Sequence, residues 1–267
     1  MFNKLKNLVR DLLPKNYQVP VKYFYGSLRG TLEDEMKLLK FLVRSHDHVI
    51  DIGGNRGIYA YQLWKLGTKV EVFEPNPTCA RILSAWAVDK PTVNVHTVAL
   101  SSHVGSANLH IPIDESGIEH DASASIENTG FLHARDQLVP LQTLDSYQFE
   151  DVSLIKIDVE GHEYSVIEGA EATIISSRPA LLVEIEQRHN SRPIGEVFEK
   201  IIVFGYEGYF MMKGKLMPLK NFNVASNQSM EDFNNSTGVY INNFLFLHQS
   251  RLAEGEYGNL ISNGLLN

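Results

Sequence analysis

Cysteine, positive charge and long apolar runs are what this 267-residue sequence has least of. Its single cysteine, Cys79, excludes an intrachain disulfide and a cysteine zinc cluster. No apolar run approaches the roughly 20 residues that span a bilayer, and the N-terminus lacks the continuous apolar core of a signal peptide. Lysine and arginine number 24 against 32 aspartates and glutamates, and this net charge of −8 argues against nucleic acid as a partner. The absences together predict a cytoplasmic protein.

Residues 1–30 are predicted to form an arm ahead of one large domain, residues 31–267. Hydrophobic residues make up 43% of the chain, which is enough for a full core. Apolar residues recur in the arm at helical spacing, with lysine and arginine between them: they are Phe2, Leu5, Leu8, Val9, Leu12 and Leu13. Such a helix packs on the body or on a second copy in a homo-oligomer, or it touches an anionic membrane surface peripherally. The sequence leaves these alternatives open.

Short runs rich in valine and isoleucine alternate with helical patterns along the middle of the chain. The runs cover residues 48–52, 69–73, 93–98, 153–157 and 180–185. Strands that alternate with helices of this length are typical of β-α-β units. The sequence therefore predicts an α/β fold with a mostly parallel sheet and helices on both faces.

Three further segments complete the predicted organisation. Residues 32–43 have helical periodicity. Residues 113–137 are polar and irregular, and a long loop inside a compact domain is usually functional, so we expect it to cover the acceptor. Two aromatic-rich runs, residues 206–212 and 239–248, predict an antiparallel pair at the C-terminal edge of the sheet.

A glycine-rich turn follows the first predicted strand, in residues 49–57. Glycines there let the backbone approach a ligand and place peptide N–H groups beside it. A dinucleotide fingerprint needs glycines at two positions that Asn55 and Ile58 occupy, so the turn fits the acidic-x-Gly-x-x-x-Gly loop of S-adenosylmethionine enzymes better. The candidate cofactor-binding residues in it are Asp51, Gly53, Gly54, Asn55 and Gly57.

The next two strands end in further candidate cofactor contacts. Glu74 closes the second strand, where a carboxylate can accept both hydroxyls of a ribose, and Pro75 and Asn76 follow it. The third strand leads to Ala99, Leu100 and Ser101, whose backbone turn can pack on adenine. Alone, Asp51 could be a turn former and Glu74 a solvated strand end. Together, at the same edge of a parallel sheet, they indicate a nucleoside site.

Charged residues gather at the end of the fourth strand. Lys156, Asp158, Glu160 and His162 fall within seven positions, and that edge of an open α/β sheet faces the ligand crevice. Strand alternation puts Lys156 and Asp158 on one face. These four residues are the catalytic candidates.

Three motifs in order resemble the FkbM-type methyltransferases: Asp-Ile-Gly-Gly-Asn-Arg-Gly (51–57), Phe-Glu-Pro-Asn-Pro (73–77) and Ile-Lys-Ile-Asp-Val-Glu-Gly-His-Glu (155–163). Val-Pro-Leu-Gln-Thr-Leu-Asp (139–145) is similar to the segment before the family's fourth strand. Gly-Gly-Asn stands where the family more often has Gly-Ala-Asn. The resemblance implies a Rossmann-like class I methyltransferase fold. It also implies O-methylation, from S-adenosylmethionine, of a hydroxyl on a sugar, polysaccharide or natural-product acceptor, with S-adenosylhomocysteine as the product.

An alcohol attacks a methyl group efficiently only when a base takes its proton. Asp158 and His162 are the candidates for this base, and Glu160 could orient one of them. His162 has the more suitable ordinary pKa, whereas Asp158 is better placed at the strand end. His162 could instead cap a helix, and Lys156 could simply pair with a carboxylate.

Glu184 and Glu186, at the end of the fifth strand, share a face and could bind sugar hydroxyls. With Asp158 or His162 they could hold a divalent ion, but no tight ligand spacing supports this, and we expect no metal site. Two rival functions stay open at this point. One is a non-catalytic module that binds a nucleoside cofactor, and the other is a nicotinamide-dependent oxidoreductase, which the missing glycines disfavour.

Overall fold

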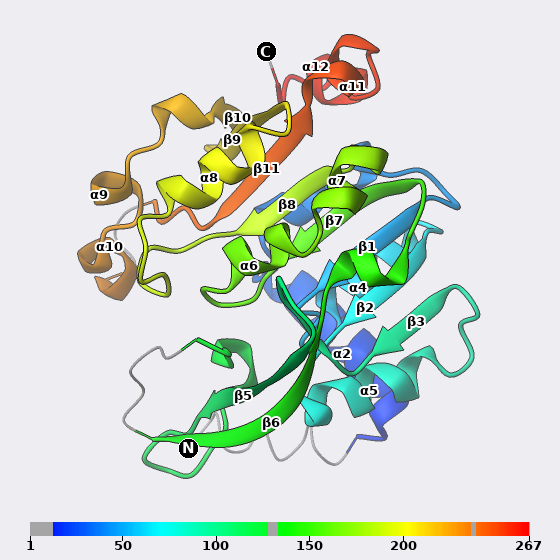
Figure 1. The fold of residues 1–267 in the computed structure, drawn as a ribbon, viewed down its shortest axis with the longest axis vertical. Coiled ribbons are helices and arrows are strands. Elements are labelled where there is room, and N and C mark those ends of the chain that lie inside the picture. Colours follow the sequence, from blue (N-terminus) through cyan, green and yellow to red (C-terminus); the bar gives the residue numbers. More distant parts are fainter. Residues whose placement is uncertain (1–12, 128–132, 236–238, 267) are drawn as a thin grey trace.

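An eight-stranded sheet carries the structure, a computed structural model that describes residues 13–127, 133–235 and 239–266 (Figure 1). The strand order is β10-β9-β11-β8-β7-β1-β2-β3, and all pairs from β8 to β3 are parallel. The strands are β1 (His48–Ile52), β2 (Lys69–Phe73), β3 (Val93–His96), β7 (Val152–Ile157), β8 (Ala180–Glu184), β9 (Tyr206–Met212), β10 (Lys215–Pro218) and β11 (Asn243–His248). The predicted α/β fold with a mostly parallel sheet is confirmed.

The C-terminal end of the sheet is antiparallel. β11 lies between β8 and β9 and runs antiparallel to both, so the predicted pair is confirmed as β9 and β11. β11 begins at Asn243 instead of residue 239. The outermost strand is β10, which the sequence pattern does not predict because four residues after a turn carry too little periodicity.

Helices cover both faces of the sheet (Figure 1). Alternate strand residues point to opposite faces, so Val49 and Leu154 belong to one hydrophobic cluster, with α2, α4 and α5, and Ile50 and Ile155 to another, with α6, α7 and α8. The α-helices are α2 (Lys15–Arg29), α3 (Leu39–Leu42), α4 (Ile58–Lys65), α5 (Pro77–Ala87), α6 (Glu163–Glu168), α7 (Glu171–Ser177), α8 (Gly195–Ile202), α9 (Val224–Asn227), α10 (Met230–Asn235), α11 (Gln249–Ala253) and α12 (Gly258–Ser262). Short 3-10 helices are η1 (Asp34–Lys37), η2 (Asp121–Ser123), η3 (Leu144–Tyr147) and η4 (Leu219–Asn221).

The predicted N-terminal arm is described from residue 13 onward. Its second half forms α2, where Val19 is fully buried in the same cluster as Tyr59 and Leu83. The apolar pattern of the first half falls on residues 1–12, outside the described residues, and the boundary at residue 30 stays a prediction. Of the helices in the described part, none has both the length and the apolarity needed to cross a bilayer.

Residues 32–43, predicted as one helix, form η1 and α3 instead. Gly30 ends α2 in the left-handed conformation, with φ at 64°, and redirects the chain. The consecutive residues Leu38 and Leu39 are both fully buried. Their packing outweighs the intrinsic preference for a continuous helix, which is worth less than 1 kcal/mol per ordinary residue.

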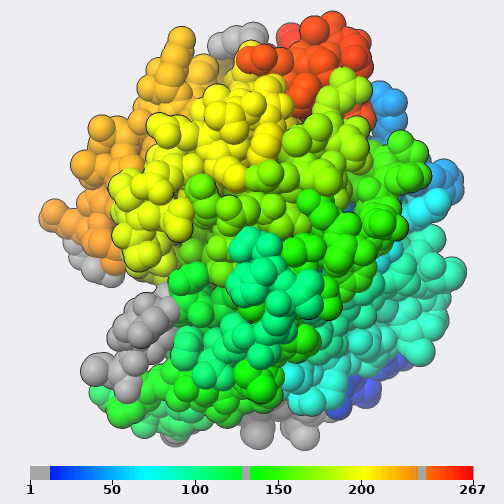
Figure 2. All heavy atoms as spheres, viewed as in Figure 1, coloured from blue at the N-terminus to red at the C-terminus, as the bar shows by residue number. Residues whose placement is uncertain are grey.

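A second sheet of three strands, in the order β4-β6-β5, stands beside the main one. It consists of β4 (Ala99–Leu100), β5 (Gly105–Pro112) and β6 (Ala134–Gln142). The prediction of an irregular loop over 113–137 is wrong for residues 134–137, which pair with β5. These residues are polar, so only long-range pairing reveals the strand. Figure 2 shows a hollow in the surface between this sheet, in green, and the yellow and orange C-terminal elements.

Phe244 tests the core on the C-terminal side of the sheet. It is fully buried and packs against Phe198 and Phe222. We expect Phe244→Ala to lower the free energy of unfolding by about 3–5 kcal/mol, because it leaves a cavity. Val203→Ala, at a position that is 75% exposed, should change it by no more than about 0.5 kcal/mol. Equal effects of the two changes in urea titrations would contradict this assignment of the core.

Candidate functional site

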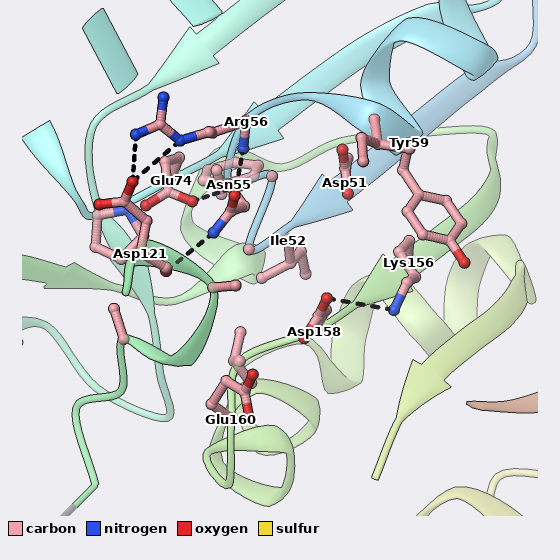
Figure 3. A pocket seen from close by; sticks show the side chains of 18 of the residues that line it. Asp51, Ile52, Asn55, Arg56, Tyr59, Glu74, Asp121, Lys156, Asp158 and Glu160 are labelled. Atoms are coloured by element: carbon pink, nitrogen blue, oxygen red, sulfur yellow. Dashed lines mark hydrogen bonds and ion pairs between the residues drawn. The ribbon is translucent and has the colours of Figure 1, made fainter. Parts of the chain in front are cut away.

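A cavity of about 210 Å³ lies at the carboxyl ends of β1, β2 and β7 (Figure 3). The strand order reverses between β1 and β7, and in open α/β sheets ligands bind outside such a reversal. Asp51, Glu74 and Asp158 reach this cavity from the ends of three strands, and Asp121 of η2 lies beside Glu74. The structure therefore brings together acids that are more than 100 positions apart in the sequence.

The glycine-rich turn after β1 is packed so closely that it requires glycine. A Cβ on Gly53 would lie 1.8 Å from the carbonyl oxygen of Asp158, and φ of Gly53 is +81°. A Cβ on Gly54 would lie 2.3 Å from the Val72 side chain. Gly57, with φ at 77°, precedes α4 and does not line the cavity, whereas Gly53 and Gly54 do. The turn is thus a backbone cradle at the cavity wall.

Glu74 is buried and braces the turn. Its two carboxylate oxygens accept backbone N–H groups, from Asn55 at 2.6 Å and from Asn76 at 2.7 Å. Burial raises the pKa of Glu74 to about 7, although these two hydrogen bonds lower it. Each carboxylate oxygen keeps a second acceptor position. Glu74 can therefore still accept hydroxyl donors from the cavity, beside Pro75, which also lines it.

Asp121 lies against the same turn, and sequence reasoning missed it. Its carboxylate pairs with the Arg56 guanidinium, with Nε at 3.0 Å, and accepts from the Asn76 amide at 3.1 Å. Its backbone carbonyl accepts from the Asn55 side chain at 2.9 Å. These bonds, which we call the Asp121 contacts, attach η2 to the glycine-rich turn after β1. No local sequence pattern around residue 121 predicts them.

Asp51 has an unused carboxylate oxygen at the cavity. The residue is 2% exposed, and its Oδ2 has no hydrogen-bond partner among the described residues. Burial raises the pKa of Asp51 to about 7, Lys156 lowers it and Asp158 raises it. A buried acceptor without a partner calls for one. Together with the glycine cradle, it fits a cofactor that carries an ammonium group and a ribose.

Lys156 is fully buried beside the cavity. Its Nζ lies 3.3 Å from the carbonyl oxygen of Ile157, 3.4 Å from Asn243 Oδ1 and 3.9 Å from Asp158 Oδ2. Burial alone would lower the pKa of Lys156, but the surrounding carboxylates, Asp158 foremost, outweigh it and raise the pKa. Lys156 is therefore an ammonium at neutral pH, which makes it a cation that supports Asp158 and not a base.

Asp158 and Glu160 occupy the turn after β7, and both line the cavity. The Asp158 side chain is 30% exposed and reaches open space, while burial raises its pKa despite the opposing effect of Lys156. Burial also raises the pKa of Glu160 to about 8, and the Asp158 carboxylate adds to this. Glu160 Oε2 lies 3.0 Å from Nε2 of His189, so this carboxyl faces a histidine in the turn that follows β8.

His162 lines the cavity but has both ring nitrogens occupied. Nδ1 lies 2.6 Å from a Glu127 carboxylate oxygen, and Nε2 lies 2.9 Å from the Ser101 hydroxyl. His162 stands at the N-cap position of α6 without a capping hydrogen bond from its side chain. Ala99 and Leu100 line the cavity, but they belong to β4 of the second sheet and not, as predicted, to the end of the third strand, and Ser101 does not line the cavity. Ser101 instead contacts His162, which does line the cavity.

Glu184 and Glu186 lie at the end of β8 but do not line the cavity. Glu184 accepts from the Asn242 amide at 2.7 Å. Glu186 accepts from Arg188 at 2.6 and 2.9 Å and from the Tyr240 hydroxyl. Both carboxylates are thus engaged by other side chains.

Among the described residues, Glu160, Glu186 and His189 form a group of metal-type donors whose ligand atoms lie within 4.8 Å of one another. This set differs from the combinations of Glu184 and Glu186 with Asp158 or His162 considered from the sequence. The guanidinium of Arg188 already neutralises Glu186 through two hydrogen bonds. A divalent ion would have to displace that cation.

Two further cavity residues come from parts of the chain without a recognised motif. Glu33, just before η1, and Tyr59, in α4, line the cavity beside Lys156. Their hydrogen bonds join the N-terminal segment to Asn243 of β11. Sequence reasoning missed all three, because nothing local distinguishes them from surface or core residues.

The methyltransferase FkbM domain model matches residues 51–209, which is more than half of the chain. The chain therefore belongs to the FkbM methyltransferase family, and the resemblance seen in its motifs is confirmed. No match was found among the curated proteins.

Solved structures of other methyltransferases are similar at low identity. A methyltransferase FkbM from Methylobacillus flagellatus KT is 16% identical, with a TM-score of 0.49 over 90% of this chain and 57% of that one. The present chain thus spans less than two thirds of that protein's length. A precorrin-6y C5,15-methyltransferase from Geobacter metallireducens GS-15 is 8% identical, with a TM-score of 0.45 over 81% and 86% of the two chains. An rRNA methylase from Streptococcus thermophilus is 12% identical, with a TM-score of 0.42 over 80% and 95%.

The glycine cradle can be tested with a pair of variants. Gly53→Ala places a methyl group against the Asp158 carbonyl, and we expect it to abolish S-adenosylhomocysteine binding measured by calorimetry. Gly117→Ala is the matched control, because Gly117 has nearly the same φ, +78°, but open space around its Cβ. Gly117→Ala should lower the free energy of unfolding by only the backbone strain of about 1–2 kcal/mol, and it should keep full binding. Comparable binding by both variants would argue against the cradle.

The raised pKa of Glu160 predicts a pH dependence of stability. The folded state binds the carboxyl proton up to about pH 8, whereas the unfolded chain releases it near 4.5. Ionisation therefore favours the unfolded chain, and the free energy of unfolding should fall as the pH rises between these values. Glu160→Gln should remove this contribution and make the variant relatively more stable at pH 8 than at pH 5. Exposed Glu254→Gln, measured by the same denaturation series, should leave the slope unchanged.

Proposed function

We propose that this FkbM-family methyltransferase acts on a hydroxyl oxygen of a saccharide or natural-product acceptor, with Asp158 as the general base. The observation that carries the proposal is the single cavity that joins the glycine cradle and Glu74 to Asp158. A nucleoside cofactor and a base within one cavity are what transfer to an alcohol requires.

S-adenosylmethionine fits the residues on the β1 and β2 side of the cavity. Glu74 would accept its ribose hydroxyls, Asp51 its ammonium group, and the backbone of Gly53 and Gly54 would lie against its amino-acid part. When bound, the cofactor supplies a methyl group that is already activated on a sulfonium. What remains for the chain is to orient an oxygen, exclude water and take up a proton.

Asp158 is the better supported base of the two candidates. Its carboxylate lines the cavity and is bound only by the 3.9 Å ion pair with Lys156 among the interactions described for its side chain. His162, by contrast, would have to break its bond to Glu127 or to Ser101 before a ring nitrogen could take a proton. The raised pKa of Asp158 brings its proton affinity closer to that of a useful base at neutral pH.

The charges around the cavity support an uncharged acceptor. Six carboxyl groups line it, from Glu33, Asp51, Glu74, Asp121, Asp158 and Glu160, against the three cations Lys22, Arg56 and Lys156. Like charges disfavour a phosphate or carboxylate near the reacting oxygen. A sugar or polyketide hydroxyl avoids this repulsion, and a nucleic acid does not. Glu184 and Glu186 do not line the cavity, so they would affect acceptor binding only through the residues that they contact.

The location and the partners of the arm are further parts of the proposal. We place the enzyme in the cytoplasm, with its N-terminal helix in peripheral contact with a membrane or with a second copy in a homo-oligomer. The outer face of α2 supports such a contact. There Tyr17, Phe24 and Leu28 are exposed, with Leu28 at 89%. Large apolar side chains grouped on one helix face often mark a contact surface.

Transfer of labelled methyl from S-adenosylmethionine to fractionated lysate and to a saccharide panel tests the function. We expect wild-type protein to label a hydroxyl compound, and Asp158→Asn to lower kcat by about 100-fold or more while S-adenosylhomocysteine still binds. His162→Gln should lose less than about 10-fold, and Asp136→Asn, an exposed control that pairs only with His110, should keep full activity. Equal losses in the Asp158 and His162 variants would overturn the choice of base.

Two results would replace the proposed function. Cofactor binding without transfer to any fraction would favour the non-catalytic module. Labelling of nitrogen or carbon instead of oxygen would keep a methyltransferase but change its chemistry. Membership of the methyltransferase family already disfavours the nicotinamide-dependent oxidoreductase.

A further inference from the structure

The ammonium of Lys156 is enclosed by side chains that meet from three distant parts of the chain. Asn243 Oδ1, from β11, lies 3.4 Å from Nζ, and the ring of Tyr59, from α4, lies with its centre 5.0 Å away. An aromatic face stabilises a nearby cation, more strongly where water is excluded. Lys156 itself is 1% exposed, so these neighbours replace its hydration.

Glu33 binds both of these neighbours at once. Its Oε2 accepts a hydrogen bond from the Tyr59 hydroxyl at 2.5 Å and another from Asn243 Nδ2 at 3.2 Å. Together with the contacts of Lys156 they form a closed ring of four side chains. We call Glu33, Tyr59, Lys156 and Asn243 the lysine ring.

The chemistry of the groups allows only one arrangement of this ring. Lys156 can only donate, so Asn243 must turn its Oδ1 toward Nζ. Its Nδ2 must then face an acceptor, which Glu33 supplies. Burial and the adjacent Glu33 charge raise the pKa of Tyr59 well above its ordinary value, so its hydroxyl stays a donor. Glu33 is thus the acceptor that fixes both neighbours of the lysine.

We propose that Glu33 is a positioning residue of the transfer reaction, which holds Asn243 and Tyr59 against Lys156 and so keeps the ammonium beside Asp158. The proposal rests on the proposed function, since it gives the ring a task only if Asp158 is the base. Glu33 and Asn243 both lie outside residues 51–209, so family membership assigns them no role. Glu33 also lines the cavity, on the side of Thr31 and Met36.

The effect of Glu33 is expected to be geometric more than electrostatic. Glu33 is an exposed residue at the edge of the cavity, where solvent weakens charge–charge interactions. Its hydrogen bonds, however, determine the positions of the Asn243 amide and the Tyr59 phenol. Misplacement of a catalytic group by about 1 Å can cost about 100-fold in rate.

Charged groups on every side shift the pKa of Asp158, and all of them except Glu33 are the same in each variant compared below. They come from every element that packs around the turn after β7: Lys22 of α2, Glu33 before η1, Asp51 of β1, Lys156 of β7, Glu160 and Glu163 beside the turn, Glu184 of β8 and Glu186 after it. Removal of the Glu33 charge takes away one of the influences that raise the pKa of Asp158. Loss of the Glu33 charge by itself should therefore lower that pKa, whereas movement of the Lys156 ammonium away from Asp158 should raise it.

The kinetic test compares Glu33→Ala, Glu33→Gln and the control Asp34→Ala in the labelled-methyl assay, with the acceptor found there. Asp34 is the neighbouring acid, exposed, and pairs with Lys37 instead of the ring. We expect Glu33→Ala to lower kcat by about 10-fold or more, with the affinity for S-adenosylhomocysteine within about threefold of wild type. Glu33→Gln keeps a carbonyl acceptor and should recover most of the loss. An unchanged kcat, or a loss of cofactor affinity equal to the loss of rate, would overturn the positioning role.

A second measurement needs no acceptor, so it separates this proposal from the proposed function. In protein labelled with carbon-13 at the aspartate carboxyls, the Asp158 signal is identified by its absence from Asp158→Asn. Glu33→Ala and Glu33→Gln both remove the charge, but only Glu33→Ala removes the acceptor that holds Asn243 and Tyr59. If Glu33 keeps the ammonium beside Asp158, the titration of Asp158 should lie at higher pH in Glu33→Ala than in Glu33→Gln, because Lys156 lowers the pKa of Asp158. Asp34→Ala should titrate as wild type. If wild-type protein transfers no methyl group but this difference occurs, the function fails and the ring stands. Equal titration in Glu33→Ala and Glu33→Gln would refute the positioning role.

Discussion

The contact between the Gly53 backbone and the Asp158 carbonyl is the constraint on which the site depends. It presses the turn after β1 onto the turn after β7, so that any side chain at position 53 would collide with it at 1.8 Å. The hydrogen bond from the Asp158 N–H to the Ile52 carbonyl, at 2.9 Å, holds the same two strand ends together. Through this contact, the part of the cavity lined by the glycine turn and the part lined by Asp158 have one fixed geometry.

The buried acids of this site lower the stability of the fold. Asp51, Glu74 and Glu163 each have a pKa raised to about 7, chiefly by burial, so the fold keeps carboxyl groups where ionisation is unfavourable. A chain selected for stability alone would not place them together. Lys156, inside the lysine ring, is the cation that partly offsets this charge on the acceptor side. A cationic cofactor would relieve it on the other side.

The predictable part of the fold and site is the part that is local in the sequence. Strands β1, β2, β7 and β8 are short runs rich in valine, isoleucine and leucine. The acids Asp51, Glu74 and Asp158 stand at or near the ends of three of them, so these acids could be placed in one cavity from the pattern alone. Asp121 and Glu33, which line the cavity, and Asn243, which contacts Lys156 and Glu33, could not be placed there, because each arrives only through tertiary packing. The first half of strand β6 could not be predicted for the same reason, because polar residues such as Asp136 and Gln137 form it by pairing with β5.

The Asp121 contacts tie η2 to Asn55 and Asn76, the two residues whose backbone N–H groups bind Glu74. The Arg56–Asp121 pair is largely shielded from solvent, so dissolved ions screen it little. A displacement of η2 would therefore reach the Glu74 carboxylate through one intervening residue. The geometry of this cavity wall is thus set in part by a short helix that belongs to no motif.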